Sequence, residues 1–300
     1  MSGRPRLALV AAGVARRGKT PPRPAEVRGT GRAATTSRAL AAAILLAVAA
    51  ARARAQDFAS PAPPALSTAA AAPAHFLEHG LPGPRASIAA QALESRWYEV
   101  PGLVTRAVAV AAGWRSIRAA AGISRTGDPE LGWSTCAIAL GVAGVRAGGG
   151  LRAVARRDLD PRALDAALGP GTGLEVGGGA WADAGAGVSL FASAPQIFMR
   201  GEAPPLERGF ELGACWVMDD LSLRLARVSG RGGAAVAQHE AGLALAAGPV
   251  TAWLEARDQP ARGALGLAAR LGTLEVAAVV ESHPLLGETV RLSLLLSPGP

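Results

Sequence analysis

Several residue types are scarce in this chain of 300 residues. Aromatic residues make up 4%, there are two cysteines, and asparagine is absent. No stretch beyond residue 55 is long and apolar enough to be a transmembrane helix, which excludes a helical membrane protein. Basic residues are also unevenly placed, because residues 1–55 hold 11 of the 31 Lys and Arg, and the remainder has a formal net charge of −2. The high isoelectric point therefore belongs to the N-terminal segment, and we expect no binding of nucleic acid.

Residues 1–55 have the features of a presequence with a secretory signal peptide. A basic flank at Arg32 and Arg38 precedes the apolar run Ala39–Ala51, which is too short to span a membrane. Small residues at Ala53 and Ala55 place cleavage between Ala55 and Gln56. The long basic region before the apolar run also suggests a later start of translation.

Two motifs in the N-terminal part resemble functional sites. Residues 13–20 match the phosphate-loop pattern, but three prolines follow at once, where that site needs the first turn of a helix. His75–His79 matches the H-x-x-E-H pattern of zinc hydrolases. Proline and glycine around it allow barely two turns of helix, and the other histidines, His239 and His283, lie in or beside predicted strands. We therefore predict no metal site, no nucleotide site and no cofactor.

Residues 56–86 form an N-terminal segment rich in alanine and proline. Its prolines are Pro61, Pro63, Pro64, Pro73, Pro82 and Pro84. Such spacing prevents long regular structure. The segment is interpreted as a tail, or as a short plug that enters a lumen.

From Ser87 onward apolar and polar residues alternate with the period of β-strands. The predicted strands are 87–94, 103–112, 114–124, 132–142, 147–157, 172–182, 185–193, 209–218, 221–229, 234–247, 250–257, 263–271, 274–281 and 289–297. Most are close to the length that a tilted strand needs to cross a bilayer. The pattern predicts an all-β fold over residues 87–297, an antiparallel up-and-down transmembrane β-barrel of about 14 strands, within a range of about 12 to 16.

Three tight turns predict the register of their hairpins. Gly272-Thr273 places Leu271 opposite Leu274, Ala269 opposite Val276, Leu265 opposite Val280 and Arg270 opposite Glu275. Asp219-Asp220 places Met218 opposite Leu221, Trp216 opposite Leu223 and Ala214 opposite Leu225. Gly248-Pro249 places Leu243 opposite Leu254 and Glu240 opposite Arg257. Each hairpin is therefore apolar on one face only.

The connections alternate in length along the chain. Short ones are predicted at Gly113, 143–146, 183–184, 219–220, 248–249 and 272–273, and longer ones at 95–102, 125–131, 158–171, 194–208, 230–233, 258–262 and 282–288. Outer-membrane barrels have short periplasmic turns and longer extracellular loops. This alternation predicts a barrel in the cell outer membrane with both ends of the barrel domain on the periplasmic side.

Alternation alone does not decide which face points outward, and a lipocalin-like soluble barrel has its apolar face inside. A wide barrel could hardly be filled by side chains as small as alanine, which favours lipid on the apolar side. The polar face carries mid-strand charges of both signs, and these are the candidate lumen-facing residues: Arg118, Glu211, Arg224, Glu240, Glu255, Arg257, Arg270, Glu275 and Arg291. The candidate interfacial aromatic residues, near strand ends, are Trp114, Trp133, Trp181 and Trp216.

The remaining chemistry-bearing residues are interpreted as structural. Cys136 and Cys215 fall on opposite faces of strands that are not neighbours, so no disulfide is expected. The glycine clusters Gly148–Gly150 and Gly177–Gly179 are interpreted as kinks or bulges that let a barrel curve. No catalytic group of residues assembles from the sequence, so we predict no enzyme.

The strand count and loop alternation, over residues 56–297, resemble those of FadL-like and PorV-like outer-membrane proteins. The resemblance implies passage of a small hydrophobic solute, or anchoring of a surface-protein or secretion-system partner. It also implies contact with the lipid bilayer and the barrel-insertion machinery. Three alternatives stay open: a barrel with a filled lumen that serves a structural role, a soluble secreted all-β binding protein, and a hydrolase carried on a barrel.

Overall fold

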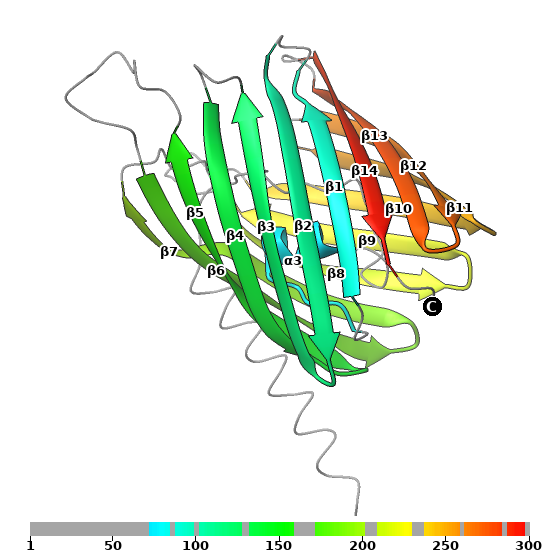
Figure 1. Cartoon of the computed structure of the whole chain (residues 1–300). Coiled ribbons are helices and arrows are strands. Elements are labelled where there is room, and N and C mark those ends of the chain that lie inside the picture. The colour runs from blue at the N-terminus through cyan, green and yellow to red at the C-terminus, as the bar shows by residue number, and fades with distance from the viewer. Residues whose placement is uncertain are drawn as a thin grey trace, which may run out of the picture.

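The computed structural model describes residues 72–84, 88–98, 102–127, 132–158, 172–201, 209–229, 237–258, 261–283 and 287–297. These residues form a closed barrel of 14 antiparallel strands in which each strand pairs with its neighbour in sequence and β1 pairs with β14 (Figure 1). The predicted all-β, up-and-down barrel is therefore confirmed. The presequence and the phosphate-loop pattern lie outside the described residues.

The strands follow the predicted ranges closely. Their bounds are β1 Ile88–Arg96, β2 Val104–Trp114, β3 Ile117–Gly127, β4 Gly132–Ala143, β5 Ala147–Asp158, β6 Thr172–Gly185, β7 Val188–Gly201, β8 Phe210–Met218, β9 Leu221–Ser229, β10 Gln238–Ala247, β11 Val250–Asp258, β12 Ala261–Leu271, β13 Leu274–His283 and β14 Gly287–Leu296. The largest differences are at β7, which continues to Gly201, and at β10, which begins at Gln238. One predicted longer connection, 258–262, shrinks to residues 259–260 because both flanking strands extend into it.

The three predicted hairpin registers are confirmed. Leu271 pairs with Leu274, Met218 with Leu221, and Leu243 with Leu254, together with the other predicted pairs of each hairpin. A two-residue loop leaves no freedom to slip, because a shift by one residue would turn every apolar side chain to the other face.

Two turns lie beyond their predicted positions. The turn predicted at Gly113 lies at residues 115–116, where Arg115 has a φ of 52°, and Trp114 pairs with Ile117. The turn predicted at 183–184 lies at residues 186–187, with Ala186 at a φ of 51°. The predictions rested on the turn-forming residues Gly113 and Asp183. The pairing of the flanking strands instead places both reversals two to three residues later.

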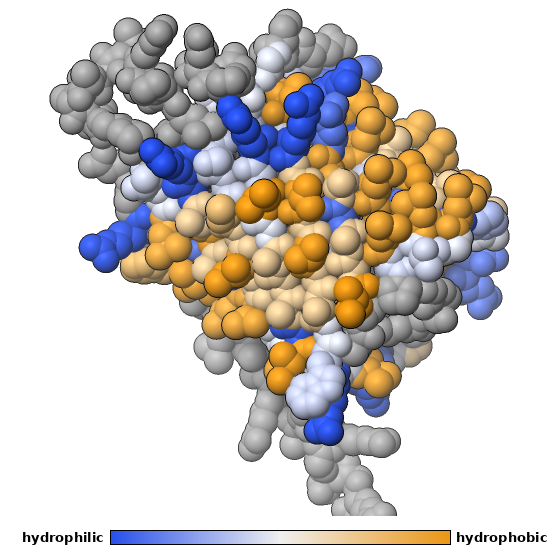
Figure 2. Space-filling view, viewed as in Figure 1, coloured by the Kyte–Doolittle hydropathy of each residue, from blue (hydrophilic) through white to orange (hydrophobic). Residues whose placement is uncertain are grey.

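The two faces of the wall differ in chemistry. Large apolar side chains of alternate residues point outward, among them Ile123 at 62% exposure and Leu265 at 61%. Figure 2 shows a broad orange and tan band of such residues across this outer face. The intervening residues point inward and are small or polar, for example the buried Thr135 and Thr289. The barrel thus has an apolar outer wall and a largely polar interior.

Residues 72–84, here called the luminal segment, lie inside the barrel. They include the helix α3, Pro73–His79, which contacts strands β1 to β7 and is seen behind β1, β2 and β3 in Figure 1. Gly80 caps the C-terminus of helix α3 and has a φ of 69°. Within the described part of the chain, no helix is both long and apolar enough to cross a membrane.

The two rims of the barrel are named by their connections. The short-turn rim carries residues 115–116, 144–146, 186–187, 219–220, 248–249 and 272–273, and the long-loop rim carries the connections at the opposite ends of the strands. The luminal segment reaches the short-turn rim at its C-terminal end, because Gly83 and Pro84 contact Arg118, close to the 115–116 turn.

Candidate functional site

The luminal segment is held to the wall through its backbone. The Arg152 guanidinium donates a hydrogen bond to the carbonyl oxygen of Leu77 at 2.9 Å, and the Ser193 hydroxyl donates to that of His79 at 2.8 Å. The Trp181 indole donates from Nε1 to the carbonyl oxygen of Pro82 at 2.9 Å. These donors come from β5, β6 and β7, and they satisfy carbonyl groups at the end of α3 and beyond it.

The two ends of the segment are held in the same way. At the start of α3, the amide of Ala74 donates to Oε1 of Gln91 at 3.1 Å, and Gln91 donates onward to Ser293 at 2.9 Å. At the other end, Arg118 donates to the carbonyl oxygens of Gly83 and Pro84 at 3.1 and 2.9 Å. Arg118, a candidate lumen-facing residue, therefore binds the luminal segment.

Apolar packing accompanies these hydrogen bonds. Phe76 and Leu77 of α3 are buried against a patch of small inward-facing residues of β1 to β5. The patch consists of Leu93, Ala107, Ala109, Ala120, Ala137, Ala139 and Val154. Because these residues point inward, the part of the interior wall beneath α3 is apolar.

Glycines in β5 and β6 make room for the segment. Gly150 pairs with Gly179, and a Cβ atom at Gly150 would lie 2.8 Å from the Phe76 ring. A Cβ atom at Gly179 would lie 2.8 Å from Cδ2 of Leu81. The register shift of β6 lies next to Gly178, so the interpretation of this cluster as a bulge holds. The structure adds that both clusters form the seat of the luminal segment.

The other half of the interior carries a network of ion pairs. Its members, one from each of six strands, are Glu211 (β8), Arg224 (β9), Glu240 (β10), Arg257 (β11), Glu281 (β13) and Arg291 (β14). Arg224 pairs with Glu211, and also with Glu240 at 3.2 Å. Arg257 joins Glu240 at 3.0 Å to Glu281 at 3.8 Å. Acid and base alternate along the network, which keeps each buried charge compensated.

The network continues to both sides. Arg262 of β12 lies 3.5 Å from Glu281, and His79 of α3 lies 3.6 Å from Glu211. A separate group behind α3 joins Glu175 to Arg152 at 3.5 Å and to Arg156 at 3.9 Å. The network thus contacts the luminal segment through His79, and the Glu175 group contacts it through Arg152.

The nine candidate lumen-facing charges all lie on the inward-facing side of their strands, but in four different settings. Five belong to the network: Glu211, Arg224, Glu240, Arg257 and Arg291. Glu255 shares the inward face of β11 with Trp253 and Arg257. Arg270 lies at the short-turn rim opposite Glu275, and it donates to Gly272 and Ser297. Arg118 binds the luminal segment.

The structure corrects the prediction for two of the four candidate interfacial tryptophans. Trp181 is buried at 6% exposure inside the barrel, and Trp133 lies on the inward face of β4 beside Arg156. Trp114 and Trp216 do point outward. A position near a strand end does not determine whether a side chain points inward or outward. The in–out alternation along the strand determines it. Trp181 shares its face with Gly179, which makes it inward.

Sequence reasoning missed several groups that hold the segment or the network. They are Gln91, Arg152, Arg156, Glu175, Ser193, Arg262 and Glu281. Extending the alternation along β5 from Val154 would have identified Arg152 and Arg156, and β13 would have supplied Glu281. The partners of Gln91 and Ser193 carry no signal in the sequence, because they lie far along the chain.

His75 is the titratable group that its surroundings perturb most. Burial, with a smaller contribution from the positive charge of Arg224, lowers the pKa of its imidazole to about 3. Its Nε2 atom is buried and makes no hydrogen bond within the described part of the chain. The ring lies beside that of His79, with centroids 4.6 Å apart. Among the described residues, no group of three or more His, Cys, Asp or Glu is placed to hold a metal ion.

The two cysteines are free, Cys136 on the outer wall and Cys215 buried inside, as their opposite parity predicts.

The fold and the interior together define a class: a closed β-barrel with an apolar outer wall, a charged inner wall and an N-terminal segment inside it. Within the described residues, ion pairs dominate the charged part of the interior.

Comparison with known proteins gives no assignment. No protein-family model matches the chain, and no curated protein matches it. Solved structures of engineered variants of the Rhodopseudomonas blastica porin are similar at 11% sequence identity and a TM-score of 0.38, over 71% of this chain and 99% of the porin chain. A structure described by the asymmetric conductivity of engineered proteins gives the same identity and TM-score. These values are too low to establish kinship.

Proposed function

We propose that the protein is a non-enzymatic barrel of the bacterial outer membrane that lets a small solute pass and that is narrowed by its own luminal segment. One observation carries the proposal: every strand exposes at least one large apolar side chain on the outer wall, while the ion-pair network lies inside. Exposed apolar surface of this extent is unfavourable in water and favourable in lipid. The soluble secreted alternative would leave this surface in water.

The orientation follows from the connections. Short turns are typical of the periplasmic end of outer-membrane barrels, and longer loops of the extracellular end. The short-turn rim is accordingly periplasmic. The luminal segment, which leads into β1 from that rim, enters the barrel from the periplasmic side.

The interior supports passage of a solute in two ways. The ion-pair network lines the half formed by β8 to β14, where it would act on charged solutes. The half formed by β1 to β5 is apolar beneath α3. If α3 withdraws, it uncovers an apolar wall, and this supports the hydrophobic solute that the resemblance to FadL-like proteins implies.

A second function is favoured by the same segment. Residues 72–84 are held by at least five wall residues and pack tightly, which suits a permanently filled barrel that anchors a secretion-system or surface-protein partner. Passage requires the segment to move, whereas anchoring requires it to stay.

Two measurements test these functions on the full chain. Migration of outer-membrane fractions on a gel, with and without heating, reports a closed barrel; an unchanged migration with all protein in the soluble periplasm would refute the membrane proposal. Single-channel recording in planar bilayers then separates the two functions. Passage predicts conductance that increases when Leu77→Ala and Phe76→Ala loosen the segment. A silent barrel in both forms, with a partner that co-purifies, supports anchoring.

A further inference from the structure

The outer wall carries a row of arginines at the long-loop rim. Cross-strand pairing places Glu94 of β1, Arg106 of β2, Arg125 of β3, Ser134 of β4 and Arg157 of β5 at one level. Arg96 lies two residues beyond Glu94, at the long-loop end of β1. The arginines Arg96, Arg106, Arg125 and Arg157 are called the arginine row. Figure 2 shows blue side chains gathered along this edge of the apolar band.

The row has more positive charge than its own acid compensates. Glu94 binds both Arg96 and Arg106, at 3.1 and 3.2 Å, so one carboxylate serves two guanidinium groups. Arg125 stands directly opposite Arg106 across the β2–β3 pair and makes no ion pair within the described part of the chain. Like charges directly opposite each other on a sheet repel, so an anion beside the two side chains would stabilise this pair.

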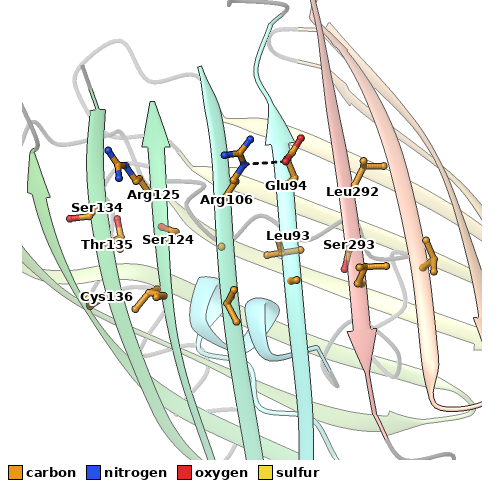
Figure 3. Close-up of a pocket in the computed structure, with 16 residues that line it drawn as sticks. Leu93, Glu94, Arg106, Ser124, Arg125, Ser134, Thr135, Cys136, Leu292 and Ser293 are labelled. Atoms are coloured by element: carbon orange, nitrogen blue, oxygen red, sulfur yellow. Dashed lines mark hydrogen bonds and ion pairs between the residues drawn. The ribbon is translucent and has the colours of Figure 1, made fainter. Parts of the chain in front are cut away.

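An apolar depression begins directly below the row. It has a volume of about 820 Å³, and Figure 3 shows Glu94, Arg106 and Arg125 together at one end of it. Its floor is lowered by the small residues Ala92 and Cys136, and its sides are formed by Val108, Ile123, Leu292 and Leu294. All six point outward, with the large ones about half exposed. The depression therefore lies on the lipid side of the wall.

We propose that this surface is a binding site for a membrane lipid that carries phosphate groups and several acyl chains. The guanidinium groups of Arg106 and Arg125 bind phosphate, with which arginine forms paired charge-assisted hydrogen bonds. The acyl chains fill the depression below. From β2 to β5 the row extends for about 14 Å, at about 4.8 Å a strand. This length suits a headgroup with two separated phosphates better than one with a single phosphate.

The site rests on the proposed function, because only a barrel in the outer membrane presents its long-loop rim to the outer leaflet. The occupant is therefore a polyphosphorylated, acylated lipid of that leaflet. Neither the luminal segment nor the ion-pair network takes part, since both lie on the other side of the wall.

The test measures binding of purified lipid A, which has two phosphates, to the full-length mature barrel in neutral detergent. Phosphatidylglycerol and phosphatidylcholine serve as lipids with one phosphate and with no net charge. We expect the double variant Arg106→Gln with Arg125→Gln to weaken binding of lipid A at least tenfold. The matched control is Arg200→Gln with Arg227→Gln, which removes two exposed charges from the long-loop ends of β7 and β9, and it should change binding by less than twofold.

A second variant tests the depression separately from the charges. Ala92→Phe fills it from the outer wall and leaves every arginine in place, and it should weaken binding of lipid A at least fivefold. Cys136 provides a direct readout, because bound acyl chains should slow its reaction with N-ethylmaleimide at least threefold, while Cys215 is buried and does not compete.

Three results would overturn the site: equal loss of binding in the two double variants, equal binding of lipid A and phosphatidylcholine, or no effect of Ala92→Phe. Heat-modifiable migration and membrane fractionation of each variant are measured in parallel. A barrel that inserts in the membrane but shows no preference among the lipids refutes this site alone. A protein that stays soluble refutes the proposed function as well.

Discussion

Gly150 of β5 lies against the ring of Phe76, so close that a Cβ atom on residue 150 would stand 2.8 Å from Cε2 of that ring. Its partner across the β5–β6 pair, Gly179, gives way to Leu81 in the same manner. The wall is thus shaped to the luminal segment at the level of single methyl groups, and the two must be considered as one packed unit.

Substitution of Gly150 by valine should displace the luminal segment. Overpacking a fitted site costs about 1–3 kcal/mol. Release of residues 72–84 relieves the contacts with Phe76 and Gly80, whereas the contact with the carbonyl oxygen of Leu140 in the wall remains. We expect faster cleavage of these residues by a non-specific protease while the barrel keeps its heat-modifiable migration. The control is Gly263→Val, because a Cβ atom at Gly263 meets nothing within 4 Å. Equal protease resistance of the two variants would contradict the fitted seat.

Arg152→Gln should weaken the hold on α3. The substitution removes the hydrogen bond to Leu77 and the closer of the two cationic partners of the buried Glu175. Hydrogen bonds to charged groups contribute about 1.5–3 kcal/mol, so a loss of that order is expected in the free energy of unfolding in detergent. Arg157→Gln, on the outward face of the same strand, should change it by less than about 0.5 kcal/mol. The urea dependence of tryptophan fluorescence measures both.

Acid should release the luminal segment through His75. Its pKa is about 3 in the folded protein and near 6.5 in the unfolded chain, so the unfolded or released form binds the proton more tightly. The stabilisation is complete above pH 6.5 and falls as the pH drops from 6.5 toward 3, by up to about 1.4 kcal/mol per pH unit.

Protease sensitivity of residues 72–84, measured between pH 7 and pH 4, checks this dependence. His75→Gln, which stays neutral, should flatten the profile across that range, whereas His239→Gln on the exposed outer wall should leave it as in the natural protein. Carboxylates also titrate in the lower part of the window, so a profile that is identical in all three proteins would assign the effect to them instead.

Neutralising Arg224 should alter ion selectivity. Arg224→Gln leaves Glu211 and Glu240 without their shared partner and makes the interior more negative. We expect the permeability ratio of cation to anion to rise by at least about twofold at low salt, where screening is weak. Arg227→Gln removes a charge from the outward face of the same strand and serves as the control. Unchanged selectivity in the Arg224 variant would place the conducting path away from the network.

Local signals sufficed wherever neighbouring residues decide the outcome. The pairing of Leu271 with Leu274 follows from a two-residue turn between two alternating strands, and the pairing of Glu240 with Arg257 follows in the same way. Turn-forming residues alone were a weaker guide. Turns were predicted at Gly113 and at 183–184, but the chain reverses at Arg115 and at Ala186.

The interior could be predicted only in part. Alternation identifies Arg224 as an inward-facing residue, but it does not reveal that Arg224 bridges carboxylates of β8 and β10. It does not distinguish Arg118, which binds the luminal segment, from the members of the network either. Trp181 shows the same limit, because its partner Pro82 lies 99 residues earlier in the chain.

The sequence by itself determined the strands, their order, the registers of the tight hairpins and the opposite chemistry of the two faces, because each depends on residues close together in the chain and on a period of two. Only the tertiary structure decided that β1 pairs with β14, that residues 72–84 occupy the interior, and that Gly150 and Gly179 leave room for their side chains. These features depend on contacts between residues far apart in sequence, where shape and the geometry of closure decide which groups meet.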